Sequence, residues 1–233
     1  IDSVGGTPLR ERLDDAGQYY DQDDPRGYHE TLGFDEASPI LSQSEGGACQ
    51  QNFTIALTDG FWNGGDPQVG ERDADSDTDF DGGDYALNED ETLADVAMYY
   101  YEEDLVPGLS DDVPTADAID DRNPAQKMVT YGIGFGVNGT LDANPPNFTD
   151  SFDWPAPSAD SEETIDDLRH AAWNGRGQFL SAGNPAQLVS AMQRALSDIA
   201  GRTTGTAAAL EFSSEAAQTG DATFLTLFDS ADW

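Results

Sequence analysis

Positive charge is scarce in this chain. Its 233 residues include 10 Lys and Arg but 46 Asp and Glu, which gives a formal net charge of −36, and Lys127 is the only lysine. Nucleic acids and anionic membrane surfaces would repel such a protein, which argues against both as partners. The acidity has three interpretations: a disordered acidic tail, a set of cation sites, or the surface of a protein from a high-salt habitat. The acidic residues are spread over segments that also carry core patterns, and lysine is nearly absent, so the high-salt surface is favoured.

Cysteine is almost missing as well. Cys49 is the only one in the sequence, which excludes an internal disulfide and a cysteine-based metal cluster. Two interpretations remain open. Cys49 is either a free thiol buried just before a strand, or it pairs with a cysteine outside this sequence or in another molecule, as is typical of exported proteins.

Long apolar runs and catalytic signatures are also missing. No run of about 18 apolar residues occurs, so no segment is expected to span a membrane. The sequence has no G-x-S-x-G motif, phosphate loop or dinucleotide fingerprint. Of the two histidines, His29 and His170, the second lies in a predicted helix, where a packed histidine with one hydrogen bond is expected. We therefore expect no enzymatic activity.

Helical and strand patterns alternate along most of the chain. Apolar residues three or four positions apart predict helices, and short buried runs predict strands. The helices are expected at 7–20, 92–105, 164–175 and 185–200, and the strands at 52–58, 127–136 and 177–182. Thr7, Thr92 and Asn184 are expected to cap three of the helices. This order predicts an α/β fold with a parallel sheet and helices on both faces.

The pattern changes after Arg202. The segment that follows carries no helical stripe, and 206–213 and 222–229 are predicted to be strands of a different, all-β unit. We expect two domains, 1–202 with an acidic loop insertion at 60–91, and 203–233. The chain starts at Ile1 without a methionine or a signal peptide, so it is interpreted as a processed product or an excerpt.

A hydroxyl and a carboxylate are expected at one edge of the sheet. Thr7 follows Gly5-Gly6, and Asp59 follows the strand at 52–58 and precedes Gly60. In open α/β sheets, ligands bind at the carboxyl ends of the strands. Oxygen ligands of this kind suit Mg²⁺, although two of them make only part of an octahedral site. The alternative is that Thr7 is only a helix cap and Asp59 only a turn residue.

These segments resemble the von Willebrand factor A domain family. The resemblance is carried by GGTPL, by the strand that ends in TDG, by MVTYGIGFG and by GQFLSAGNPAQLVSAMQRAL. It implies a Rossmann-like fold, here incomplete at its N-terminus, with a metal-ion-dependent adhesion site in which Thr7 and Asp59 contribute to the metal. The family also has an Asp-x-Ser-x-Ser loop, which is not found ahead of Thr7. Mg²⁺ binding is therefore expected if that motif lies upstream.

A narrower resemblance is to the PilY family of secreted proteins in type IV pilus assembly and pilus tips. It covers roughly residues 5–233 and is carried by CQQNFTIALTDGFWNG, TLADVAMYYYEEDL, MVTYGIGFGVNGTL and DDLRHAAWNGRGQFLSAGNPAQL. ATFLTLFDSADW is similar to the entry into the β-propeller that follows in that family. The resemblance implies a secreted, pilus-associated module whose partners are pilins, minor pilins or a host or surface ligand.

A second candidate site is the acidic loop. Asp73, Asp75, Asp77, Asp79 and Asp81 alternate, and Gly82 follows them. Counted from Asp77, the spacing fits the first half of an EF-hand calcium loop, but Asn88 stands where glutamate is needed. Strand-like alternation would place all five aspartates on one face, where they repel one another unless a cation lies among them. The alternative is a solvated acidic insertion.

Two functions are consistent with these observations. The first is an adhesion and assembly module of a type IV pilus that recognises its partner through the metal held near Thr7 and Asp59. The second is a structural extracellular module stabilised by calcium in the acidic loop, with no metal-mediated ligand binding.

Overall fold

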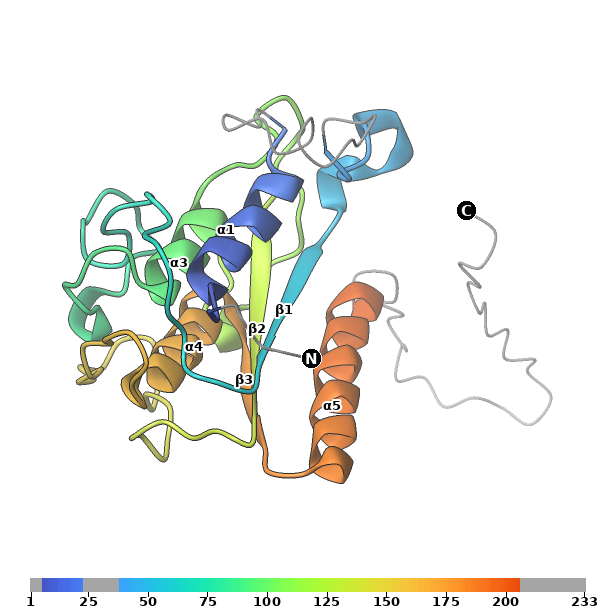
Figure 1. Ribbon diagram of the computed structural model, residues 1–233. Helices are drawn as coiled ribbons and strands as arrows, with labels where there is room; N and C mark the ends of the chain where they lie inside the picture. The colour runs from blue at the N-terminus through green and yellow to red at the C-terminus, as the bar shows by residue number, and fades with distance from the viewer. Residues whose placement is uncertain (1–5, 23–37, 206–233) are drawn as a thin grey trace, which may run out of the picture.

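The described chain is a three-layer α/β structure with a parallel sheet in the middle. The computed structural model describes residues 6–22 and 38–205. Its sheet has the strand order β1-β2-β3, formed by Asn52–Thr58, Met128–Phe135 and Arg176–Ala182. Both strand pairs are parallel, and Thr58 at the end of β1 lies opposite Gly134 of β2. The predicted parallel sheet is therefore confirmed (Figure 1).

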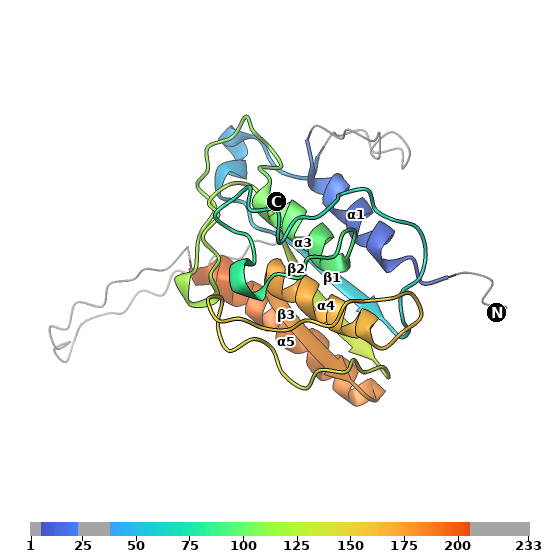
Figure 2. The ribbon, with the colours of Figure 1, turned by 90° about the vertical axis from the view of Figure 1, so that its left-hand side faces the viewer.

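Helices cover both faces of this sheet. One face carries α1 (Leu9–Tyr20), α3 (Leu93–Glu102) and α4 (Glu163–Asn174), whereas α5 (Pro185–Gly205) lies alone on the other (Figures 1 and 2). The short helices η1 to η4 lie in the connecting loops, at Gln43–Glu45, Gly47–Cys49, Gly83–Tyr85 and Asp117–Ile119. The four predicted helices are confirmed with shifted ends: α1 begins at Leu9 instead of residue 7, α3 ends at Glu102 instead of residue 105, and α5 continues to Gly205 instead of ending at residue 200.

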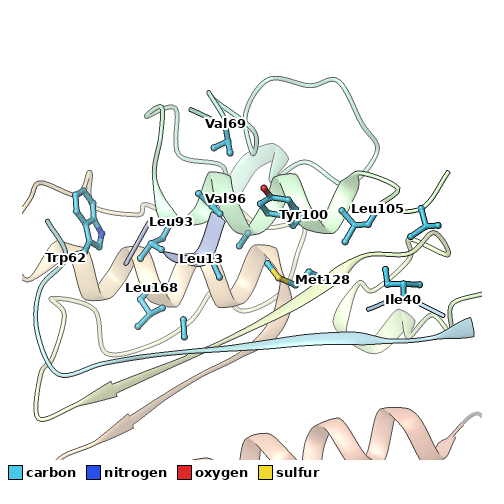
Figure 3. Packing of buried hydrophobic residues seen from close by; sticks show 14 residues of the cluster. Leu13, Ile40, Trp62, Val69, Leu93, Val96, Tyr100, Leu105, Met128 and Leu168 are labelled. Atoms are coloured by element: carbon cyan, nitrogen blue, oxygen red, sulfur yellow. The ribbon is translucent and has the colours of Figure 1, made fainter. Parts of the chain in front are cut away.

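Two hydrophobic cores follow from the alternation of side chains along the strands. On the α5 side, Phe53 and Ile55 of β1 pack with residues of β2, β3 and α5. On the other side, Met128 packs with Leu93 and Leu168 of α3 and α4, and all three are fully buried (Figure 3). Helix α4 approaches the sheet closely, because a Cβ atom on Gly132 would lie 3.0 Å from Leu168. These contacts fix the sheet edge that carries the candidate site.

The helix starts agree with two of the three predicted caps. Thr92 and Asp95 form a reciprocal capping box at α3, and the Asn184 side chain accepts a hydrogen bond from the backbone of Gln187 at 3.0 Å. The prediction for Thr7 is wrong, because Pro8 occupies the cap position of α1 and no side chain caps this helix. Proline can begin a helix because its missing N–H is not needed there. The Thr7 hydroxyl is thus left available.

The acidic loop between β1 and α3 has an irregular backbone. Between β1 and α3 the structure has no strand, only the short helix η3. The backbone N–H of Gly82 donates to the carbonyl of Asp73 at 2.8 Å and closes the segment into a loop. Ser76 has a positive φ of 61°, which turns the chain inside this loop. Because the backbone is irregular, the five aspartates do not share the single face that strand-like alternation would give them.

Two predictions lie outside the described residues. These are the strands at 206–213 and 222–229, together with most of the predicted second domain at 203–233. Among the described residues, no helix combines the length and the apolar character that a membrane crossing requires.

Candidate metal-binding sites

Thr7 lies beside the loop that follows β1, at the carboxyl edge of the sheet. The turn before α1 brings Thr7 beside the loop that follows β1, and a Cβ atom placed on Gly60 would lie 3.7 Å from Oγ1 of Thr7. The hydroxyl of Thr58 folds this loop back by donating to the carbonyl of Gly60 at 2.7 Å. Two segments about fifty residues apart in sequence therefore meet where α/β folds bind ligands.

Asn63 holds these two segments together, although no sequence pattern singles it out. Its Oδ1 accepts a hydrogen bond from the backbone N–H of Thr7 at 2.7 Å, and its own backbone N–H donates to the carbonyl of Thr7 at 3.0 Å. Its Nδ2 donates to Asp160 at 2.7 Å. No local pattern could have identified Asn63, since both of its partners are distant in sequence.

The two oxygen groups at this edge are open to a ligand. Asp59 is exposed and Thr7 is half-buried. Within the described ranges, neither the carboxylate of Asp59 nor the hydroxyl of Thr7 forms a hydrogen bond or an ion pair. Both are hard oxygen ligands of the kind that Mg²⁺ prefers, and they would fill two of its six positions.

The five aspartates of the acidic loop separate into different environments. Oxygens of Asp75, Asp77 and Asp81 lie within 4.8 Å of one another, and these three residues are called the outer cluster below. Asp79 is exposed and is not part of it. Asp73 points into the protein instead. The predicted set of five calcium ligands is thus brought together only in part.

Asp73 belongs to a second group, formed with Glu71 and Asp95 and called the inner cluster below. Oxygens of these three residues also lie within 4.8 Å of one another. Asp73 is 1% exposed, and its Oδ2 lies 2.9 Å from Nε2 of His170. Burial opposes ionisation of Asp73, but the hydrogen bond and charge of His170 hold its pKa below the usual value. The packed role predicted for His170 agrees with this contact.

Asp95 has a different electrostatic character from Asp73. Burial, together with the charge of Asp73, raises the pKa of Asp95 to about 8, against the hydrogen bonds from Thr92 and the backbone of Arg72. Asp95 therefore retains a proton in the folded state at a pH where an ordinary aspartate has lost it. The inner cluster is a structural group that caps α3 and anchors the loop.

The outer cluster has a buried neighbour that the sequence analysis missed. Glu102, the last residue of α3, has a side chain that is only 1% exposed. Burial and the charges of Asp77 and Asp81 raise the pKa of Glu102 to about 8. Burial and the charges of Asp75 and Asp77 likewise raise the pKa of Asp81 to about 6. These carboxylates oppose one another's ionisation, which a bound cation would relieve.

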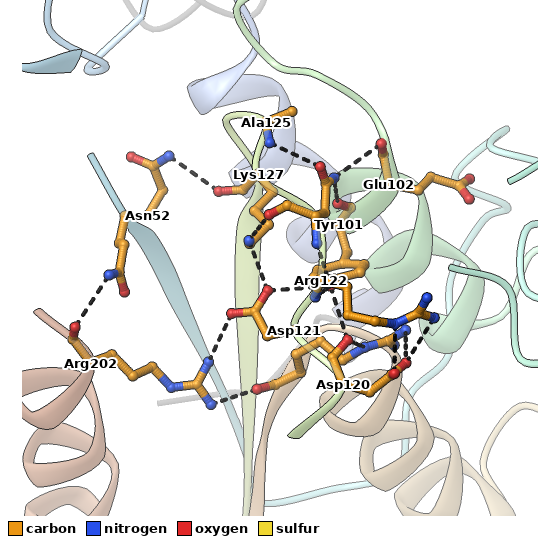
Figure 4. A network of polar contacts seen from close by, with 12 residues as sticks. Asn52, Tyr101, Glu102, Asp120, Asp121, Arg122, Ala125, Lys127 and Arg202 are labelled. Atoms are coloured by element: carbon orange, nitrogen blue, oxygen red, sulfur yellow. Dashed lines mark hydrogen bonds and ion pairs between the residues drawn. The ribbon is translucent and has the colours of Figure 1, made fainter. Parts of the chain in front are cut away.

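Several of the rare cations are used inside the protein, at the opposite edge of the sheet. Lys127 is 2% exposed, and its Nζ lies 2.7 Å from Asp121. Arg176 is 1% exposed and lies 3.3 Å from Asp120. Arg202 reaches the same network from α5 (Figure 4). Because these positive charges are buried or half-buried, the outer surface of the described chain is left strongly acidic.

The remaining candidate residues have no role in these sites. Cys49 is exposed, so the predicted buried thiol is wrong, and pairing with another cysteine stays a prediction. The thiol ends a short helix, η2, that lies outside the core. His29 lies outside the described residues.

Three relatives are type IV pilus biogenesis factors. PilY1 of Pseudomonas aeruginosa strain PAK is 32% identical over 229 residues, which cover 85% of this chain and 19% of the relative. PilY1 of strain PAO1 is 31% identical over the same shares, and PilY1 of strain UCBPP-PA14 is 30% identical over 86% of this chain. No protein-family model and no solved structure matches the chain. The chain thus spans about a fifth of these relatives, and over 85% of its own length it is homologous to the type IV pilus biogenesis factor PilY1.

Proposed function

We propose that this chain is a secreted, non-enzymatic module of a type IV pilus protein and recognises its partner through a divalent cation at the carboxyl edge of the sheet. The homology to PilY1 supports the pilus context. The adhesion role is supported by the approach of Thr7 to the turn at Gly60, 3.7 Å from a Cβ placed there. Pilins, minor pilins and host or surface ligands are the proposed partners.

The proposed mechanism is a metal bridge. Asp59 and the hydroxyl of Thr7 would hold Mg²⁺ directly or through water, and a carboxylate of the partner would complete the coordination. Asn63 would keep the two ligands in place by its hydrogen bonds to the backbone of Thr7. Water would fill the remaining positions, since the ion takes six ligands.

The test measures binding of the full-length pilus protein to isolated pili, with magnesium or with a chelator. Asp59→Ala and Thr7→Ala are each expected to weaken the magnesium-dependent part of binding by about tenfold or more, equivalent to about 1.4 kcal/mol. Asp111→Ala is the matched control, because Asp111 is an exposed aspartate in a different loop. If both variants bind as tightly as the unchanged protein, the metal bridge is refuted.

A further inference from the structure

The outer cluster is the strongest group of ligating side chains that the proposed function leaves unused. We propose that the outer cluster binds a calcium ion beside the buried carboxylate of Glu102, and that this ion fastens the acidic loop to the end of α3. This site does not depend on the recognition proposed for Thr7 and Asp59. It differs from the sequence-based prediction, because it omits Asp73 and Asp79 and has a buried carboxylate from a helix, Glu102, beside it.

The spacing of the carboxylates fits calcium. Calcium binds oxygen at 2.3–2.6 Å, so two ligands on opposite sides of the ion are about 4.6–5.2 Å apart. The oxygens of Asp75, Asp77 and Asp81 all lie within 4.8 Å of one another. An ion can therefore contact all three with little movement of the loop.

Glu102 provides an independent reason to place a cation here. Its Oε2 accepts a hydrogen bond from the hydroxyl of Thr78 at 2.9 Å, while Oε1 is buried and accepts no hydrogen bond from the described residues. The backbone N–H of Thr78 also donates to Asp81 at 3.0 Å, so Thr78 joins Glu102 to the outer cluster. Figure 4 shows the Glu102 side chain pointing away from the network around Asp121. A buried carboxylate oxygen without a donor is costly, and a cation would remove that cost.

Arg72 does not satisfy these carboxylates. Its Nη1 lies 3.7 Å from Asp77 and 3.9 Å from Glu102, which exceeds hydrogen-bonding distance. Its other contacts hold it in place, since Nε donates to the carbonyl of Val69 at 2.8 Å and the guanidinium lies 4.7 Å from the ring centre of Tyr99. Arg72 is therefore one distant positive charge beside four carboxylates, those of the outer cluster and Glu102. The remaining negative charge favours the binding of a divalent cation.

The ligand set favours calcium over magnesium. Calcium accepts six to eight oxygens in irregular geometry, whereas magnesium requires an octahedron and keeps several of its waters. Here the ligands are carboxylates on an irregular, solvent-exposed loop, where Asp75 and Asp77 are exposed and water can complete the shell. Sites of this kind in extracellular modules bind calcium with dissociation constants of about 10⁻⁴–10⁻³ M.

The experiment titrates the full chain with calcium chloride, magnesium chloride or an equal ionic strength of sodium chloride, and records the melting temperature and the heat of binding. At about 10 mM calcium, the melting temperature is expected to rise by roughly 5–10 °C. Asp77→Asn and Glu102→Gln are expected to weaken calcium binding about tenfold and to abolish most of this rise. Asp79→Asn is the matched control, because it removes an equal charge from the same loop.

Three results would overturn the site. These are the absence of a calcium-specific rise, an equal rise with sodium chloride, and an equal loss in Asp79→Asn and Asp77→Asn, which would indicate diffuse attraction of ions to an acidic loop. Asp77 has a side chain that is 50% exposed, so its substitution should leave the fold intact even if Glu102→Gln does not fold. None of these readouts involves binding to pili.

Discussion

The inner and outer clusters are both groups of three carboxylates in or beside the acidic loop, yet they are in opposite environments. Asp73 and Asp95 of the inner cluster are 1% and 0% exposed, and backbone, hydroxyl and imidazole groups surround them. Asp75 and Asp77 of the outer cluster are exposed. The difference shows that the tertiary structure, by placing donors beside some carboxylates and solvent beside others, determines whether a carboxylate stabilises the fold or is available to bind an ion. Asp73 and Asp95 of the inner cluster have hydrogen-bond partners within the protein, whereas the outer cluster is proposed to be neutralised by an ion.

The first prediction concerns the inner cluster and has the largest expected effect. Asp73→Ala should lower the free energy of unfolding by about 3–5 kcal/mol, because it removes the buried partner of His170. It also removes the acceptor for the backbone N–H of Leu87. Urea denaturation without calcium measures this effect.

The control for that prediction is Asp75→Ala. In the absence of calcium it should lower the free energy of unfolding by less than about 0.5 kcal/mol, because Asp75 is exposed. Equal losses in the two variants would remove the distinction between the clusters.

The second prediction uses the raised pKa of Asp95. Its ordinary value is 3.8 and its value in the folded protein is about 8, so between these limits the folded state holds a proton that the unfolded chain has released. Stability therefore falls as pH rises from about 4 to 8, by at most about 1.4 kcal/mol per pH unit from this group. Glu71 and Asp73, with His170 behind them, face Asp95 and contribute to the same profile.

Asp95→Asn should make that pH profile shallower, since asparagine keeps the size and one acceptor but cannot ionise. Urea unfolding in chelator at several pH values between 5 and 8 would measure the difference. A profile of unchanged slope in the variant would show that Asp95 is ionised in the folded protein.

The third prediction has the smallest expected effect. Asp79→Asn should change the free energy of unfolding by less than about 0.5 kcal/mol, because the residue is exposed and its side chain belongs to neither cluster. Its carbonyl, which accepts from Arg122 at 3.0 Å, is retained. Thermal melting with and without calcium is the measurement. A loss comparable to that of Asp73→Ala would mean that the loop acts as one undivided acidic unit.

Structural features that depend on residues close together in the sequence could be predicted well. The strand at 52–58 was recovered with its observed bounds because apolar residues alternate there. The cap at Thr92 was predicted correctly because its partner, Asp95, lies within the first helical turn. The parallel sheet followed from the alternation of helices and strands. At Thr7 the same local reasoning was wrong, since Pro8 took the cap position.

By itself, then, the sequence determined the order of elements, the acidic surface and the two segments that carry the candidate ligands Thr7 and Asp59, because each of these depends on neighbouring residues. Only the tertiary structure decided that Asp73 turns inward to His170, that Glu102 joins the outer cluster and that Asn63 holds Thr7. These contacts join residues 24 to 97 positions apart. The hydrophobic periodicity of the sequence cannot predict such pairs, because they form only when packing brings the helices and loops together.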